Sequence, residues 1–273
     1  MSNDLIQNNG AITRAELDCQ ITTAKAYPRD VTRFIPTATQ LATIDEETAQ
    51  SCFYALPPRK GKDGKMSEIK GPSIRLAEIA AGCWGNIHIG SRVIENDGKF
   101  ITAEGVAWDL ENNVKVIMEH KVGITYKDGG TYNSDMQKNL ANAACAIALR
   151  NAIFKVVPKA LINRVYEATV KFSVGDQKKL PLLVKATIDR FVKMGIPEQT
   201  IFNFFNKPKA EDFTQDDLAQ LFGLGTAIKE NLISIDKAFV IEDETFDMKP
   251  ADRIKHLLDS AKKQLSVNED VPQ

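Results

Sequence analysis

The stretch 134–157 constrains the fold of this chain more than any other part of the sequence. Ser134 is a good helix N-cap, and Asp135 puts a negative charge in the first turn, where the helix dipole favours it. The middle is rich in alanine and contains no glycine, so intrinsic propensity predicts a helix of about six turns. Pro158 should end this helix, because proline cannot donate to the preceding turn. Residues 141–149 are small or apolar nearly all round, which predicts a position at the centre of a domain.

After its first turn, this helix and the residues that follow it carry only positive charges, as far as Glu167. No acidic residue lies between Asp135 and Glu167. Uncompensated positive charge on a central helix is what a groove for a polyanion requires. The alternative is that these cations are solvated and favour a helix C-terminus. On the first interpretation, the cations from Arg150 onward are expected to form one stripe that meets phosphate. The candidate DNA-binding residues of the interval are Lys138, Arg150, Lys155, Lys159 and Arg164.

The length of the chain and the distribution of its charges are compatible with an anionic partner. The 273 residues suffice for one sizeable domain with an appendage, or for two domains. The net charge of −1 hides an uneven distribution. Residues 59–164 contain 16 Lys and Arg against 11 Asp and Glu, and residues 206–273 contain 9 against 14. A basic middle predicts an anionic partner, and an acidic end predicts a protein partner or none.

The sequence predicts a reduced cytoplasmic protein. It has no run of about 18 apolar residues, and its N-terminus lacks the basic start and apolar core of a signal peptide. The four cysteines are widely scattered and no two have metal-ligand spacing, so they should be free thiols.

Residues 71–166 predict an α+β unit. Pro72 and Ser73 open a helix, and three strand-like runs follow before the long helix. The turns between the runs contain Asn-Asp-Gly and Asp-Gly, which are typical of hairpins, so the strands should form an antiparallel meander. Alternation over 100–108 leaves one face to pack on the long helix and the other for water or a ligand. The predicted fold class is therefore α+β, with a three-stranded antiparallel β-meander packed on a long central helix and a small helical C-terminal domain.

We expect four regions along the chain. Residues 1–44 have weak periodicity and form an N-terminal arm. Residues 45–172 form the α+β core, which begins with a short helix that Thr43 could cap. Residues 173–241 contain short amphipathic helices with clear caps and form a small helical domain. Residues 242–273 form an acidic tail with one short helix.

A basic, glycine-punctuated segment at 59–71 predicts a mobile cationic loop. It superficially matches a phosphate loop, but Arg59 replaces the first glycine of G-x-x-x-x-G-K-[ST] and Met66 replaces its Ser/Thr. We therefore expect no ATP site here. Its candidate DNA-binding residues are Arg59, Lys60, Lys62 and Lys65.

The sequence contains no catalytic motif that we recognise. H-E-x-x-H, G-x-S-x-G and a cysteine pair are all missing, so we expect no enzyme activity, no cofactor and no metal. One alternative is a metal-dependent nuclease, in which Asp109, Glu111 and Glu119 meet around a hairpin and hold the ion.

The segment 218–227 matches the helix–hairpin–helix pattern L-x-x-L-x-G-h-G-x-x, where h is apolar. In that motif a glycine-rich turn, here Gly223 to Gly225, offers backbone N–H groups to a DNA phosphate. The alternative is a simple glycine turn between two short helices. Nearby carboxylates, such as Glu230, favour this alternative because they would repel phosphate.

The helix, β-meander and long basic helix ending in ALRNAIFKVVP resemble the phage single-strand annealing proteins of the Erf, RecT and Redβ types. In the RecT type the corresponding helix has an Asp-x-Met-like start and an Arg-x-x-Phe-Lys-x-x-Pro-like end. The resemblance covers residues 45–170, with one extra residue between the Arg and the Phe of the end pattern. The matching positions are Asp135, Met136, Arg150, Phe154, Lys155 and Pro158.

The resemblance implies an ATP-independent protein that coats single-stranded DNA and pairs it with a complementary strand. It also implies assembly into rings or helical filaments. The implied location is the host cytoplasm if the protein is phage-encoded, and candidate partners are a phage exonuclease or a host single-strand binding protein. Lys and Arg would neutralise the backbone while the bases stay exposed for pairing. The rival from another class is a non-enzymatic phage adaptor or regulator that acts through protein–protein contacts.

Overall fold

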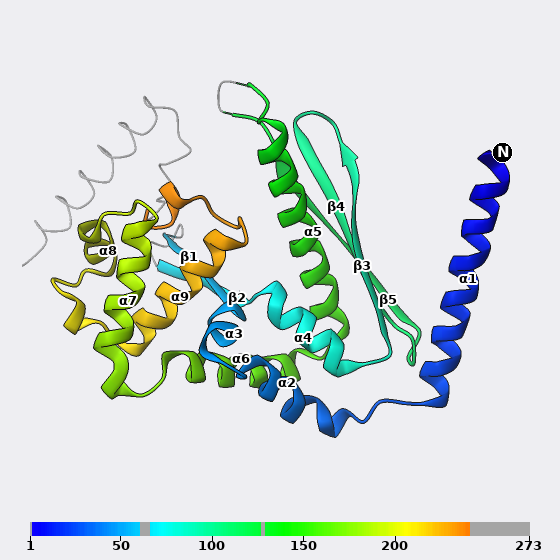
Figure 1. Ribbon diagram of the computed structural model, residues 1–273, viewed down its shortest axis with the longest axis horizontal. Helices are drawn as coiled ribbons and strands as arrows, with labels where there is room; N and C mark the ends of the chain where they lie inside the picture. The colour runs from blue at the N-terminus through cyan, green and yellow to red at the C-terminus, as the bar shows by residue number, and fades with distance from the viewer. Residues whose placement is uncertain (1, 61–65, 127–128, 241–273) are drawn as a thin grey trace, which may run out of the picture.

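The computed structural model describes residues 2–60, 66–126 and 129–240 (Figure 1). Its first part is helical and leads into a two-stranded antiparallel hairpin. The elements are α1 (Ser2–Ala26), η1 (Val31–Arg33), α2 (Phe34–Ala42), α3 (Glu46–Ser51), β1 (Phe53–Lys60) and β2 (Met66–Pro72).

A helix, a second sheet and two long helices follow the hairpin. These are α4 (Ile74–Trp84), β3 (Ile87–Asn96), β4 (Phe100–Asp109), β5 (Val114–Gly123), α5 (Ser134–Val156) and α6 (Lys159–Val174). The remaining described chain is helical: η2 (Gln177–Lys179), α7 (Leu180–Lys193), α8 (Glu198–Phe205), η3 (Ala210–Asp212), α9 (Gln215–Lys229) and η4 (Ile235–Lys237).

The three-stranded sheet has the order β3-β4-β5 and is antiparallel throughout, which confirms the predicted mixed α/β class with an antiparallel meander. Its first turn forms because Asp97 accepts hydrogen bonds from the N–H groups of Lys99 and Phe100 while Gly98 takes a positive φ of 79°. In the second turn Asn113 has a φ of 53°, a conformation that asparagine tolerates. The turn residues seen in the sequence therefore set the strand pairing.

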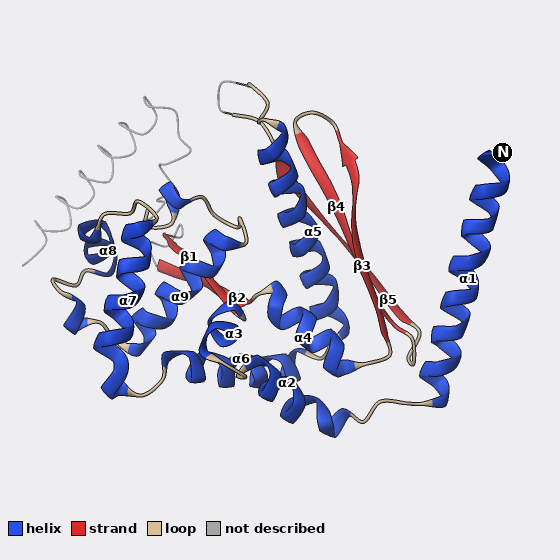
Figure 2. Ribbon diagram, in the orientation of Figure 1, coloured by secondary structure: helices blue, strands red, loops and turns tan. Residues whose placement is uncertain are grey.

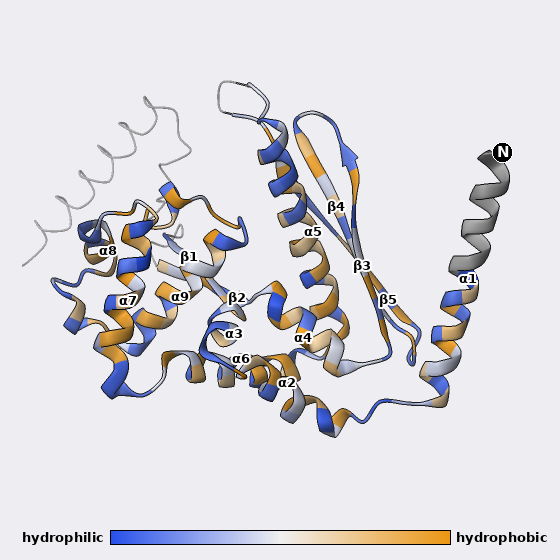
Figure 3. Cartoon of the chain, viewed as in Figure 1, coloured by the Kyte–Doolittle hydropathy of each residue, from blue (hydrophilic) through white to orange (hydrophobic). Residues whose placement is uncertain are grey.

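Helix α5 lies between the two sheets (Figure 2). Its N-terminal turns are hydrophilic and its C-terminal half is hydrophobic (Figure 3). It meets the larger sheet through small residues: a buried cluster joins Ala103 of β4 to Ala144 and Ala148 of α5. Gly105 completes this contact, because a Cβ atom there would overlap the backbone of Ala148 and Leu149. The strand and the helix therefore pack backbone to backbone.

Two hydrophobic cores stabilise the chain. One joins α2 and α4 to the C-terminal half of α5 and to α6, and includes Phe34, Leu76 and Ile153. The other joins α7 and α9 to Phe53 of β1. The first core contains residues from both sides of the expected boundary at 45, and the second contains residues from both sides of the expected boundary at 173. The division into regions itself stays a prediction, and the expected tail at 242–273 lies outside the described residues.

Several local predictions are wrong. The expected loop at 59–71 contains the end of β1 and the first six residues of β2, and residues 2–26, for which the sequence indicated only weak periodicity, form helix α1. The N-cap of α5 is Asn133, whose side chain accepts from the N–H of Met136, and not Ser134. The N-cap of α3 is Asp45 and not Thr43, because the Asp45 carboxylate accepts from the N–H of Thr48.

The helix–hairpin–helix prediction is also wrong, as is the simple glycine turn. Helix α9 runs without a break through Gly223 and Gly225. A Cβ atom on Gly223 would lie 2.6 Å from the backbone nitrogen of Ala55 and 2.7 Å from its Cβ. Gly223 therefore serves close packing of α9 on β1 and does not form a turn.

Within the described residues no single helix is long and apolar enough to cross a membrane. Helices α5 and α6 meet the length and composition requirement only as a pair, and a bend of 119° separates them.

Candidate nucleic-acid interface

The predicted DNA-binding cations do not form one continuous surface; they lie in several separate parts of the structure. Lys138 lies in the second turn of α5, highly exposed, and pairs with Asp135 at 3.2 Å. Arg150 lies about 18 Å further along the same helix axis. Arg59 is an exposed residue of β1, and Lys60 ends that strand. Lys62 and Lys65 lie outside the described residues.

Arg150 makes contacts inside the protein. Its guanidinium carbon lies 4.9 Å from the centroid of the Tyr54 ring, and its Nε and Nη2 donate to Asn151 Oδ1 at 3.3 and 3.2 Å. The side chain is only partly exposed and borders a small cavity together with Glu230. Lys155 follows five residues later, which turns it about 140° around the helix. Arg150 and Lys155 therefore do not form one stripe.

Lys155, Lys159 and Arg164 surround the bend between α5 and α6, and we call these three residues the basic corner. All three side chains are exposed, and none has an ion pair within the described parts of the chain. The neighbouring helix α2 packs against α6 and contains no charged residue. Helix α3 also packs against α6, but in the described part of the chain its Glu46 and Glu47 form no ion pair with the basic corner.

The start of α6 adds a second feature that favours anions. Its N-cap is Pro158, which makes no side-chain capping bond, and residues 158–160 are exposed. The first backbone N–H groups of an α-helix have no partner within the helix and carry partial positive charge. Helical side chains tilt toward the N-terminus, so the Arg164 side chain leans back toward this first turn. Phosphate binding at helix N-termini uses this combination of groups.

The three carboxylates of the nuclease alternative do not come together. Asp109 and Glu111 do meet around the β4–β5 turn, but both bind Arg29. Glu119 lies opposite Glu104 in the register of β4 and β5, well along the strands from that turn. Among the described residues no group of three His, Cys, Asp or Glu side chains could hold a metal ion. The three carboxylates therefore do not support the nuclease alternative.

Arg29 is the residue that the sequence did not reveal. Its side chain is 7% exposed; Nη2 donates to Asp109, and both Nε and the backbone N–H donate to Glu111 Oε1 at 2.8 Å. The guanidinium also lies 4.4 Å from the Trp84 ring centroid. Burial raises the pKa of Glu111, but hydrogen bonds from Asn86 and Arg29 outweigh it and hold that pKa below its ordinary value. Arg29 thus ties the N-terminal segment to one end of the larger sheet.

The carboxyl group of Glu230, at the end of α9, has a raised pKa. Burial raises its pKa to about 7, against the opposing effects of Arg150 and Arg75, while Glu78 adds to the rise. An unfolded chain would have the ordinary value of 4.5. Between these two values the folded protein holds a proton that the unfolded chain releases, so stability falls as the pH rises through this window.

We predict that Glu230→Gln removes this part of the pH dependence. Above pH 7 the variant should be more stable than the wild type by about 1 kcal/mol, a value reduced for partial solvation of the side chain. At pH 4.5 and below the two proteins should unfold at the same urea concentration. Urea unfolding at pH 4.5 and pH 8 measures this, with the exposed Glu198→Gln as a control. An equal difference at both pH values would contradict the titration of Glu230.

Comparison with known proteins assigns no family to the chain. No family model, no curated protein and no solved structure matches it. Its function is therefore inferred from its own residues and contacts.

Proposed function

We propose that the chain binds single-stranded DNA without ATP and pairs it with a complementary strand. The observation that carries the proposal is the basic corner, where three exposed cations without ion pairs among the described residues surround an uncapped helix start. These groups bind phosphate, and phosphate contacts do not depend on base sequence. Bases that face away from the protein stay available for a second strand, as annealing requires.

The resemblance to annealing proteins supports the same proposal from a different direction. The matched end pattern of α5 includes Lys155 and Pro158, and both residues lie at the basic corner. In this proposal α5 is the central helix of an annealing core, and residues 173–241 form a separate helical domain. The protein acts in the cytoplasm, which is that of the host cell if a phage encodes it.

The test compares charge-removing variants. Lys155→Ala, Lys159→Ala and Arg164→Ala combined should weaken binding of a fluorescent mixed-sequence oligonucleotide at least tenfold at low salt. The slope of log K against log salt should become shallower by about two, because each lost phosphate contact changes it by about 0.7 on single strands. Fluorescence anisotropy at several salt concentrations measures both quantities. Annealing of complementary oligonucleotides without ATP should slow in parallel.

The matched control removes the same charge elsewhere. Lys178, Lys185 and Lys193 are exposed on η2 and α7, and their triple alanine variant should bind DNA like the wild type. If both triple variants lose affinity equally, binding follows total charge and the basic corner has no special role. If neither changes the salt slope, the DNA-binding surface lies elsewhere.

Self-assembly is part of the proposal. Strands β3 and β5 are the edges of the larger sheet, and they expose Ile94 at 43% and Ile117 at 50%. Unpaired edge strands can pair with a second copy. We therefore predict a homo-oligomer, measured by size-exclusion chromatography with light scattering, with and without oligonucleotide. A strict monomer at micromolar concentration in both conditions would contradict it.

A further inference from the structure

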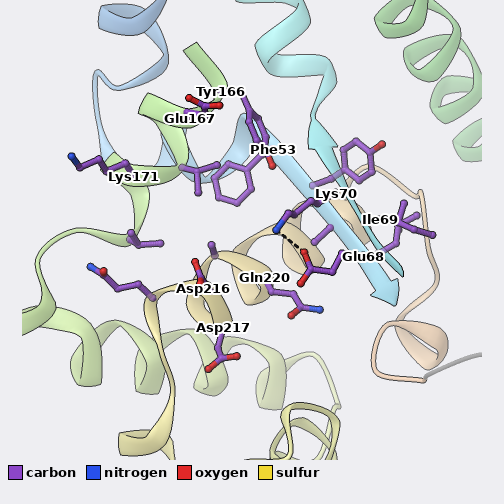
Figure 4. A pocket seen from close by; sticks show the side chains of 17 residues that line it. Phe53, Glu68, Ile69, Lys70, Tyr166, Glu167, Lys171, Asp216, Asp217 and Gln220 are labelled. Carbon is purple, nitrogen blue, oxygen red and sulfur yellow. Dashed lines mark ion pairs between the residues drawn. The ribbon is translucent and has the colours of Figure 1, made fainter. Parts of the chain in front are cut away.

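A pocket of about 510 Å³ lies between the hairpin β1–β2, helix α6 and helix α9 (Figure 4). Its volume is within the range of small-molecule sites in proteins. Residues from the two hairpin strands (53–56 and 68–70), from α6 (166–174) and from α9 (215–220) line it. The pocket shares no residue with the basic corner, although both use α6, where Arg164 precedes Glu167 by three residues.

One wall of the pocket is apolar and aromatic. Phe53 and Tyr166 contact each other edge to face, with ring centroids 6.4 Å apart, and Val170 and Val174 extend the wall along α6. The Tyr166 hydroxyl has no hydrogen-bond partner among the described residues, although its side chain is half-buried. Phe53 is only 3% exposed and Val174 7%, so the surface of this wall that a ligand can reach is mainly that of the partly exposed Tyr166 and Val170, with one hydroxyl group.

The charged groups of the pocket are mostly acidic. Four carboxylates face two ammonium groups: Glu68, Glu167, Asp216 and Asp217 against Lys70 and Lys171. Glu68 is paired with Lys70 at 2.6 Å. Asp217 accepts from the backbone N–H and the hydroxyl of Thr214 in the capping box of α9. These two carboxylates are therefore already engaged.

Glu167 and Asp216 are the two carboxylates left over. They belong to different helices, and Figure 4 shows them on opposite sides of the Phe53 ring. Neither has a hydrogen bond or an ion pair within the described chain, and both are exposed. Lys171 lies one turn after Glu167 on the same helix without forming an ion pair with it. A positive ligand group in the pocket therefore meets negative charge from two different helices, while its apolar part can contact Tyr166 and Val170.

We propose that this pocket binds an organic cation with an apolar stem, the chemistry shared by arginine and lysine side chains and by free alkyl guanidinium or alkylammonium ions. The stem packs on Tyr166 and Val170, and the charged head lies at the mouth of the pocket, where the exposed Glu167 and Asp216 supply negative charge. An aromatic ring beside a cation contributes further attraction. A polyphosphate backbone does not fit, because the excess of carboxylates repels it. This site is therefore additional to the DNA surface and does not depend on it.

Calorimetric titration of the full chain at low salt tests the proposal with two sources of the cation. The first is n-butylguanidinium chloride, and the second is a blocked pentapeptide, acetyl-Ala-Leu-Arg-Leu-Ala-amide. The neutral counterpart of the peptide has citrulline in place of arginine. Both cations should bind, and the citrulline peptide should bind at least tenfold more weakly than the arginine peptide. Tighter binding of the peptide than of the free ion assigns the site to a protein partner, and the reverse assigns it to a small molecule.

The variant pair is Glu167→Gln with Asp216→Asn, and its binding of either cation should fall at least tenfold. The matched control is Asp189→Asn with Asp236→Asn, which removes the same charge from exposed positions outside the pocket and should bind like the wild type. A pocket-filling variant, Ala219→Phe, should also lose binding while keeping every charge. Circular dichroism confirms that each variant is folded. Equal binding of arginine and citrulline peptides, or unchanged binding by the pocket variants, would overturn the proposal.

Discussion

Gly105→Ala is expected to lower the free energy of unfolding by about 3 kcal/mol or more, one of the two largest effects that we predict. The added methyl group would overlap the backbone of Ala148 and Leu149, and a helix backbone cannot rotate away as a side chain can. Strand β4 or helix α5 would have to move, and the small-residue cluster between them would separate. Urea unfolding followed by circular dichroism measures the change.

Gly90 provides the matched control for this substitution. It lies on the neighbouring strand β3, and a Cβ atom there would have nothing within 4 Å. Its φ is not positive, so Gly90→Ala should change stability by less than about 1 kcal/mol. If both substitutions had the same small effect, the close approach of β4 and α5 would not exist in solution.

Arg29→Ala is expected to cost about 3–5 kcal/mol. The substitution leaves Asp109, which is 3% exposed, and Glu111 without their cation. Asp109 would keep only weaker partners, such as the Trp84 Nε1–H at 3.3 Å. An unpaired buried carboxylate is far more costly than the loss of a solvated ion pair. Thermal and urea unfolding at pH 7 measure the loss.

The control for Arg29 is an exposed pair of the same chemistry. Arg92 pairs with Glu104 at 3.2 Å, but its side chain is 73% exposed. Arg92→Ala should therefore cost less than about 1 kcal/mol. Asp109→Asn combined with Arg29→Met should recover part of the stability lost in Arg29→Ala, because the more deeply buried of the two carboxylates is then neutral and only Glu111, whose side chain is 17% exposed, keeps a charge. A full-size loss in Arg92→Ala, or none in Arg29→Ala, would contradict this account.

The larger sheet could be predicted because its turns and strands are determined by residues close together in the sequence. Asp97, Gly98 and Asn113 determine the turns within a few residues, and β4 alternates along its length. The hairpin β1–β2 could not, because Pro57 and Pro58 lie inside β1, and proline cannot donate to a strand ladder. The structure accommodates them at an irregularity in the register between Leu56 and Arg59. Tertiary contacts thus overrode a reliable local signal.

The candidate site was predictable only in part. The absence of acidic residues between Asp135 and Glu167 indicates the interval in which the basic corner lies. Whether a given cation of that interval faces solvent depends on partners that are distant in sequence. Arg150, for example, contacts the ring of Tyr54. The same holds for Arg29, whose carboxylate partners lie 80 and 82 residues away. The periodicity of a sequence does not predict contacts between residues that are so far apart in the chain.

The bend of 119° between α5 and α6 also has a mechanical consequence. Ile153, Val157 and Ile162 on both sides of Pro158 are buried in one core, so the angle is fixed by packing and does not act as a hinge. If the proposed function holds, a strand bound by Lys155 on one side and Arg164 on the other would have to change direction within a few nucleotides. Such a bend would disturb the stacking of the neighbouring bases. Because the angle between the helices is fixed by the core, the protein would impose this bend without rearranging.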